Sequence, residues 1–176
     1  MSTPPPVVRP GQRLTANVLN SGLLIGRLVF AAYRDAAQNI STNTVGQQSD
    51  ALAWDNVALD LLGGWSTAQP TRYQPPIAGW YRVTGTASLQ GATGGSPPLR
   101  GASWRLNGGL PPAATTRPWV GSIGDTYLAF AAPDLPLLLT GTDYVELCPF
   151  QNNPAPVPTA TGSTRPSVAI YYVGPA

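Results

Sequence analysis

The chain has 176 residues, a length typical of one domain, and 43% of them are hydrophobic, which is enough for a buried core. The charged residues are ten Arg, no Lys, seven Asp and a single Glu, so the side chains that usually fill exposed helix faces are nearly absent. Glycines number 19 and prolines 20. This composition excludes a helical bundle and favours short strands joined by turns.

The beginning of the chain differs in composition from the remainder. Residues 1–13 carry four prolines and one glycine without periodic apolar positions, a pattern typical of an extended arm. Thr15 is suited to cap a short helix that ends before Gly22. We therefore expect an extended arm with one short helix over residues 1–26, and a separate folded domain over residues 27–176.

The clearest expected strand runs from Trp80 to Leu89, because apolar and polar residues alternate along it. The apolar positions include Tyr81 and Val83, and they predict the face that packs in the core. Further strands are expected at 101–107, 144–150 and 167–173, with weaker candidates at 28–33, 39–45, 51–57, 71–74 and 127–131.

The number and spacing of these strands predict the fold. The pair Asn107-Gly108 at the end of an expected strand is typical of a tight hairpin turn. So many short strands cannot form one flat sheet with a single wet face. We predict an all-β fold, an antiparallel jelly-roll β-sandwich, in which prolines occupy connections and strand edges.

The composition also limits the chemistry. The absence of His removes the usual general base and the commonest metal ligand, and a single Cys148 excludes an internal disulfide and a zinc site of paired cysteines. Ten Arg spread along a chain of net charge +2 do not form a nucleic-acid footprint. The longest apolar stretch, 22–32, is interrupted by Arg27 and too short to span a membrane. We expect no enzyme activity, cofactor, metal, nucleic acid or membrane partner.

Three weaker constellations remain as alternatives. A pair of carboxylates suited to glycoside hydrolysis would come from Asp125, Asp134, Asp143 or Glu146. Oxygen ligands for a calcium ion would come from Asp50, Asp55 and Asp60. Aspartates that bond their own turns explain the first set more simply. The five-residue spacing of the second set is not a known calcium-loop pattern. Aromatic side chains and a glycine-rich loop offer a distal surface for sugar stacking, namely Trp65, Trp119, Tyr127 and residues 91–98.

Several motifs occur in an order that is known from other proteins. The segment Gly79-Trp-Tyr-Arg-Val is followed by Arg105-Leu-Asn-Gly108 and later by Gly141-Thr-Asp-Tyr-Val-Glu-Leu147. This order resembles the trimeric jelly rolls of the tumour-necrosis-factor and complement type, in the versions found in tailed-bacteriophage virion proteins. The sequence differs from that pattern at Thr142-Asp143, where the family has Gly-Asp. Residues 10–20 are similar to N-terminal segments of phage head and tail accessory proteins.

The resemblance implies a homotrimer in the virion, assembled in the bacterial host cytoplasm beside major capsid or tail proteins. On this resemblance, we expect the trimer to serve as a surface module of the phage particle, either a head decoration or a minor tail protein. The alternative is a module that binds a receptor or a host-surface glycan. We expect the arm to anchor through Arg9, Arg13, Leu14, Val18 and Leu19. Core and trimer packing is expected from Trp54, Tyr81, Val83, Trp104, Val145 and Leu147, and distal binding from Trp65 and Trp119.

Overall fold

The structure, a computed structural model, describes residues 24–91, 99–117 and 127–176, and these ranges contain eleven strands and two short 3-10 turns. Most of the predicted arm, and the short helix with it, lies outside the described residues. The strands are β1 (Arg27–Tyr33), β2 (Asn39–Ile40), β3 (Asn56–Asp60), β4 (Gly79–Gln90), β5 (Arg100–Leu106), β6 (Thr115–Thr116), β7 (Tyr127–Ala131), β8 (Leu135–Leu139), β9 (Val145–Gln151), β10 (Val157–Pro158) and β11 (Ser167–Gly174). The 3-10 turns are η1 (Gln48–Asp50) and η2 (Gly162–Thr164).

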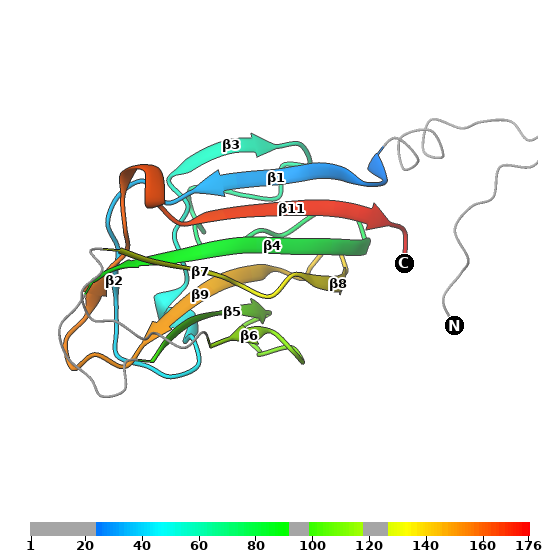
Figure 1. Cartoon of the computed structure of the whole chain (residues 1–176). Coiled ribbons are helices and arrows are strands. Elements are labelled where there is room, and N and C mark those ends of the chain that lie inside the picture. Colours follow the sequence, from blue (N-terminus) through cyan, green and yellow to red (C-terminus); the bar gives the residue numbers. More distant parts are fainter. Residues whose placement is uncertain (1–23, 92–98, 118–126) are drawn as a thin grey trace, which may run out of the picture.

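The strands form two layers. The larger sheet has the order β3-β1-β11-β4-β7, and β8 pairs with the part of β4 that β7 leaves free. The second layer contains β6-β5-β9, and β10 pairs with β2 in a small separate sheet. Figure 1 shows β3, β1, β11 and β4 side by side, with β5, β6 and β9 in the other layer. All strand pairs are antiparallel, which confirms the predicted sandwich.

Strand β4 supplies much of the core, as its alternation predicts. Tyr81, Val83 and Leu89 are fully buried, whereas Trp80 and Arg82 point to the opposite side and are exposed. The Tyr81 hydroxyl donates to the carbonyl oxygen of Ile77 at 2.7 Å, and its ring meets Tyr172 edge-on. Buried tyrosines need such a partner for the hydroxyl, so the packing and the hydrogen bond act together.

The two layers meet closely around Gly85 of β4. A Cβ atom at this position would lie 2.9 Å from Leu147 and 3.4 Å from the ring of Trp104, both from the second sheet. The Trp104 indole N–H donates to the carbonyl oxygen of Pro133 at 2.7 Å. Glycine at this point therefore makes room for the largest core side chain. The six residues expected to pack in the core are all buried: Trp54, Tyr81, Val83, Trp104, Val145 and Leu147.

The Asn107-Gly108 turn has the conformation that its sequence predicts. Both residues have positive φ, 51° and 75°, and Leu106 pairs with Gly109 across them. A two-residue hairpin turn needs positive φ at both central positions, and Asn followed by Gly tolerates this best. The Asn107 amide also donates to Asp143 at 2.6 Å, so the turn is fixed to the segment before β9.

Three of the weaker strand expectations are wrong in extent. The strand expected at 39–45 is reduced to Asn39–Ile40, and that expected at 51–57 begins only at Asn56. The strand expected at 71–74 contributes one pairing, between Tyr73 and Val145. These segments run along the open edge of β9 and bond to it only at intervals. Side chains bind part of their backbone instead: Asp50 accepts from the Ser41 N–H, and the Gln38 amide oxygen accepts from the Ala53 N–H.

Strand β9 is buried on both faces, although its alternation predicts one wet face. The segment 41–50 covers the outer side. Ser103, next to β9 on β5, donates to the Val45 carbonyl oxygen, and Arg105 donates to that of Gly46. The polar residues of β9 are therefore enclosed and need partners inside the protein. In the parts of the chain that the structure describes, no helix has the length and apolar character needed to cross a bilayer.

Replacing Tyr81 by Ala should lower the free energy of unfolding by roughly 3 to 5 kcal/mol, because it opens a large cavity between the sheets. Urea unfolding at matched protein concentrations measures this loss. Leu110→Ala is the control, since Leu110 is 47% exposed and its truncation should change stability by at most about 0.5 kcal/mol. Equal effects of the two substitutions would contradict the assignment of the inner face of β4.

Candidate functional site

The outer face of the larger sheet is unusually apolar. Strand register places Trp80 opposite Leu138 of β8, and Arg82 opposite both Pro136 and Tyr171. Small or apolar side chains occupy many further positions of this face, from β7 across to β3: Ala129, Ala131, Thr84, Thr86, Ala169, Leu28, Ala31 and Leu59. The same register also places uncharged polar residues on it at Ser88, Gln90, Ser167, Tyr33 and Asn56. We call these residues, together with Val173, the outer sheet face.

The outer sheet face carries one charged side chain among these positions, Arg82. It forms an ion pair with Asp134, to which its Nε donates at 2.8 Å. Hydrogen bonding to Arg82 lowers the pKa of Asp134, so this carboxyl stays ionised at neutral pH. The pair neutralises itself within one chain, and the face as a whole presents no net charge.

The exposed part of this face is more apolar than a sheet face that lies against water, and in this respect it is similar to a protein interface. Trp80, Leu138 and Val173 are 42%, 45% and 47% exposed and lie at the same end of β4, β8 and β11. Antiparallel sheets with one wet face usually alternate apolar and polar residues, and a contiguous apolar patch usually marks an interaction site. The small side chains on the neighbouring rows would allow a partner surface to approach closely.

The residues expected to build the core and the trimer contact all point inward. Tyr81 and Val83 face the sandwich interior, so the exposed surface of β4 is formed instead by their neighbours Trp80 and Arg82. The alternation along this strand predicts the opposite, polar face for these neighbours and does not indicate a role for them. The exposed apolar patch becomes visible only from the pairing of β4 with β8, which places Leu138 opposite Trp80. The sequence pattern does not predict β8, so it could not predict this pairing.

The residues expected to anchor the arm lie outside the described residues; they are Arg9, Arg13, Leu14, Val18 and Leu19. Trp119, expected to take part in distal binding, also lies outside them. The structure does describe the point at which the chain joins the domain. The Gly26 N–H donates to the Tyr172 carbonyl oxygen at 2.7 Å, beside the end of β11. Figure 1 shows the start of β1 and the C-terminus at the same end of the sandwich.

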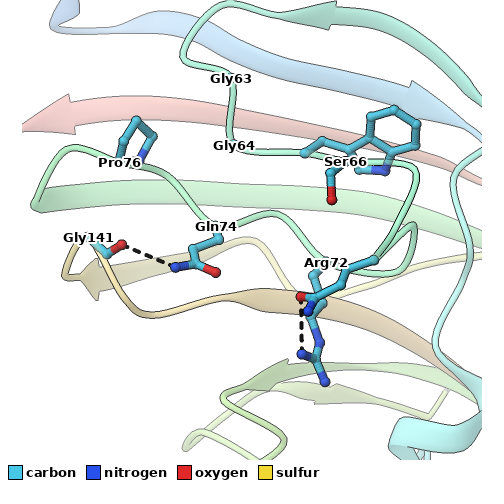
Figure 2. Close-up of a pocket in the computed structure, with 9 residues that line it drawn as sticks. Gly63, Gly64, Ser66, Arg72, Gln74, Pro76 and Gly141 are labelled. Atoms are coloured by element: carbon cyan, nitrogen blue, oxygen red, sulfur yellow. Dashed lines mark hydrogen bonds between the residues drawn. The ribbon is translucent and has the colours of Figure 1, made fainter.

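Trp65 lines a pocket on the flank of the sandwich, and its ring is partly buried against the core. Its indole N–H donates to the Pro70 carbonyl oxygen at 3.1 Å. The pocket has a volume of about 280 Å³ and is formed by the segment 63–76 together with Gly141 (Figure 2). Asp60, at the end of β3, fixes one wall by accepting from the N–H groups of Gly64 and Trp65.

The acidic residues considered for glycoside chemistry do not form a catalytic pair in the described part of the chain. Asp134 binds Arg82, and Asp143 accepts from Asn107 and Thr140. Glu146 is 2% exposed and accepts from Gln48, Thr71 and Arg72. Asp125 lies outside the described residues. Each of the three described carboxylates therefore has a structural partner.

The calcium alternative is not supported either. Asp50 is buried beside Asn43, Asp55 accepts from the backbone at Asp35 and Ala36, and Asp60 holds the turn at Gly64. Over residues 24–91, 99–117 and 127–176, no three acidic, His or Cys side chains gather as metal ligands. Cys148 is buried, and burial raises the pKa of its thiol, which keeps it protonated and unreactive.

Two solved structures are similar to this arrangement of strands. The globular domain of the zebrafish complement 1qA protein has a TM-score of 0.50 and 10% identity, covering 84% of this chain and 97% of that chain. The Eiger TNF of S. frugiperda has a TM-score of 0.54 and 7% identity, covering 85% and 94% respectively. The chain has the jelly-roll fold of C1q and TNF domains. No protein-family model and no curated protein matches the sequence.

Asp143→Ala should lower the free energy of unfolding at neutral pH by about 1 kcal/mol, allowing for solvent screening. Hydrogen bonds from Asn107 and Thr140 lower the pKa of Asp143, so the wild type has this stabilisation above the unfolded-state pKa and loses it as pH falls through the folded-state pKa. Urea unfolding at neutral and strongly acidic pH should therefore show a difference between wild type and variant that shrinks in acid. A difference that is constant with pH would contradict this role.

Proposed function

We propose that the protein is a homotrimeric, non-catalytic structural module in which the outer sheet face forms the contact between protomers. The observation that carries this proposal is the exposed apolar row of Trp80, Leu138 and Val173 on a sheet face with no net charge. Burying such a patch against a second copy removes apolar surface from water and needs no new charge partner.

The number of copies is proposed from the fold. Jelly rolls of the C1q and TNF type are typically trimeric binding modules, and this chain shares their arrangement of strands. In a closed ring of three, each protomer presents the same two surfaces to its neighbours, so one apolar face per chain can be covered without open ends. The inward-facing residues of β4 then stabilise the protomer, while Trp80 and its neighbours stabilise the trimer.

The biological setting is proposed from the sequence. The ordered motifs around Gly79 and Gly141, and the proline-rich residues 1–13, support a place in the virion of a tailed phage. In this proposal the trimer decorates the head or forms part of the tail, and the arm binds major capsid or tail proteins after synthesis in the host cytoplasm. Because residues 24–26 join the domain at the end where β11 finishes, an anchored arm would leave the opposite end of the sandwich free.

Replacing Leu138 by Glu should convert the trimer into monomers, because it places three unpaired carboxylates in apolar contacts. Light scattering coupled to size-exclusion chromatography measures the mass directly, with three times 18.4 kDa expected for the wild type. Leu110→Glu is the matched control, since Leu110 is 47% exposed but lies in the turn after β5, away from the outer sheet face. A monomeric wild type, or a trimeric Leu138→Glu variant, would refute this interface.

Deleting residues 2–20 should abolish incorporation into phage particles and leave the trimer intact, because the described strands all begin after residue 26. Labelled wild-type and truncated proteins are compared in particles assembled in the host, and the mass of each is measured in solution. Normal incorporation of the truncated protein would contradict the anchoring role. Loss of the trimer in the truncated protein would instead show that the arm takes part in protomer contact.

A further inference from the structure

The flank pocket contains several polar atoms that the fold leaves without a partner. Its walls carry Ser66, Gln69, Arg72 and Gln74, with apolar surface from Trp65 and Pro76. Figure 2 shows Ser66, Arg72 and Gln74 placed around one hollow, with Pro76 and Gly141 beside Gln74. A pocket of about 280 Å³ lies just below the usual range for ligand sites, roughly 300 to 1,000 Å³, and suits one small ligand or one unit of a larger one.

The hydrogen bonds inside the wall determine which polar atoms are available. The Gln74 amide nitrogen donates to the Gly141 carbonyl oxygen at 3.2 Å, which leaves its amide oxygen as a free acceptor. The Gln69 amide oxygen accepts from Arg72 at 3.2 Å, which leaves its amide nitrogen as a free donor. The Ser66 hydroxyl makes no hydrogen bond to the described residues and can both donate and accept.

The charge of Arg72 is already balanced. Its Nε donates to the Glu146 carboxylate at 3.2 Å, and that carboxylate is almost fully buried. The guanidinium also stacks on the Tyr144 ring, with 4.1 Å between its central carbon and the ring centre. These contacts hold Arg72 in place in the pocket wall. The pocket therefore presents fixed hydrogen-bonding groups without a net charge.

A mixed set of donors and acceptors selects the chemistry of the ligand. A phosphate or carboxylate only accepts, so it would oppose the free Gln74 oxygen, and the balanced charge of Arg72 gives it little attraction. An ammonium group only donates and would oppose Arg72 and Gln69. A hydroxyl group donates and accepts, and a sugar ring also has an apolar face that can lie on Trp65 or Pro76. We propose that this pocket binds a neutral saccharide unit.

Saturation-transfer difference NMR on the full chain tests this proposal with glucose, galactose, mannose and N-acetylglucosamine as probes. At least one of these sugars should give a signal, and glucuronic acid and sialic acid should give weaker signals. Absence of a signal from all four neutral sugars, or a stronger signal from the acidic sugars, would overturn the proposal.

Ser66→Phe should abolish the signal by filling the pocket, and it removes no side-chain hydrogen bond within the described residues. Ser163→Phe is the matched control, because Ser163 is exposed in η2 and takes no part in the pocket. Gln69→Ala provides a second variant that removes one donor without added bulk, and it should weaken the signal. Circular dichroism checks that each variant is folded. A signal unchanged in both pocket variants would refute the site.

This inference does not depend on the trimer or on the virion. The same samples are examined by light scattering, so sugar binding and oligomeric state are read separately. Ser66→Phe should remain a trimer, since Ser66 lies outside the outer sheet face. If Ser66→Phe loses sugar binding but still forms trimers, the pocket is independent of the proposed interface. If the wild type forms trimers but binds no sugar, the saccharide proposal is overturned and the trimer proposal is not.

Discussion

The two faces of strand β4 have different roles, and the rest of the structure depends on both. Strand β4 pairs with β11 along one edge and with β8 and then β7 along the other, so it is central to the larger sheet. Its inner side chains must fill the space beneath, where Gly85 leaves room for Trp104 and Leu147. Its outer side chains Trp80 and Arg82, at the start of the strand, are exposed. The core and the proposed interface are therefore the two sides of the same backbone, and a shift of register by one residue would exchange them.

A second constraint acts on β9, whose polar residues are enclosed when segment 41–50 covers its outer side. The buried Glu146 carboxylate accepts from Gln48 at 2.8 Å, from Thr71 at 2.9 Å and from Arg72 at 3.2 Å. A buried carboxylate is costly unless it has such partners. Because the partners come from two different loops, one charged group holds both loops against the strand. The wall of the flank pocket is positioned by this network, although Glu146 itself does not line the pocket.

The sequence predicts those strands in which apolar and polar residues alternate locally along the chain. β4, β7 and β11 were expected within one residue of their observed bounds, since their patterns and turns are carried by the strands themselves. β8 was missed because Leu135–Leu139 contains a proline and hardly alternates. Proline is tolerated there because β8 pairs only with β4.

The sites depend on contacts between distant residues, and local patterns do not reveal these. Trp80 and Leu138 are opposite one another only through the β4–β8 register. Gln74 and Gly141 are hydrogen-bonded side by side in the pocket wall although they are 67 positions apart in the sequence. Trp65 is predicted as part of a distal binding surface, yet the Pro70 carbonyl oxygen and the core hold it in the wall of the flank pocket. The composition shows that the chain has no His and no Lys, but the placement of its polar side chains follows from tertiary structure.

The hydrogen bond between Gly26 and Tyr172 has a mechanical consequence. β1 starts where β11 finishes, and the two strands run antiparallel with successive pairs from Arg27–Tyr172 to Tyr33–Ser167. A pulling force applied through residue 26 would load these pairs one after another, as in opening a zipper, instead of all at once. On its other side β1 pairs with β3 only from Phe30 to Tyr33, so peeling would first break the β11 row alone and then meet two rows of hydrogen bonds. Resistance to such a force would therefore rise a few residues inside the domain, beyond its attachment point.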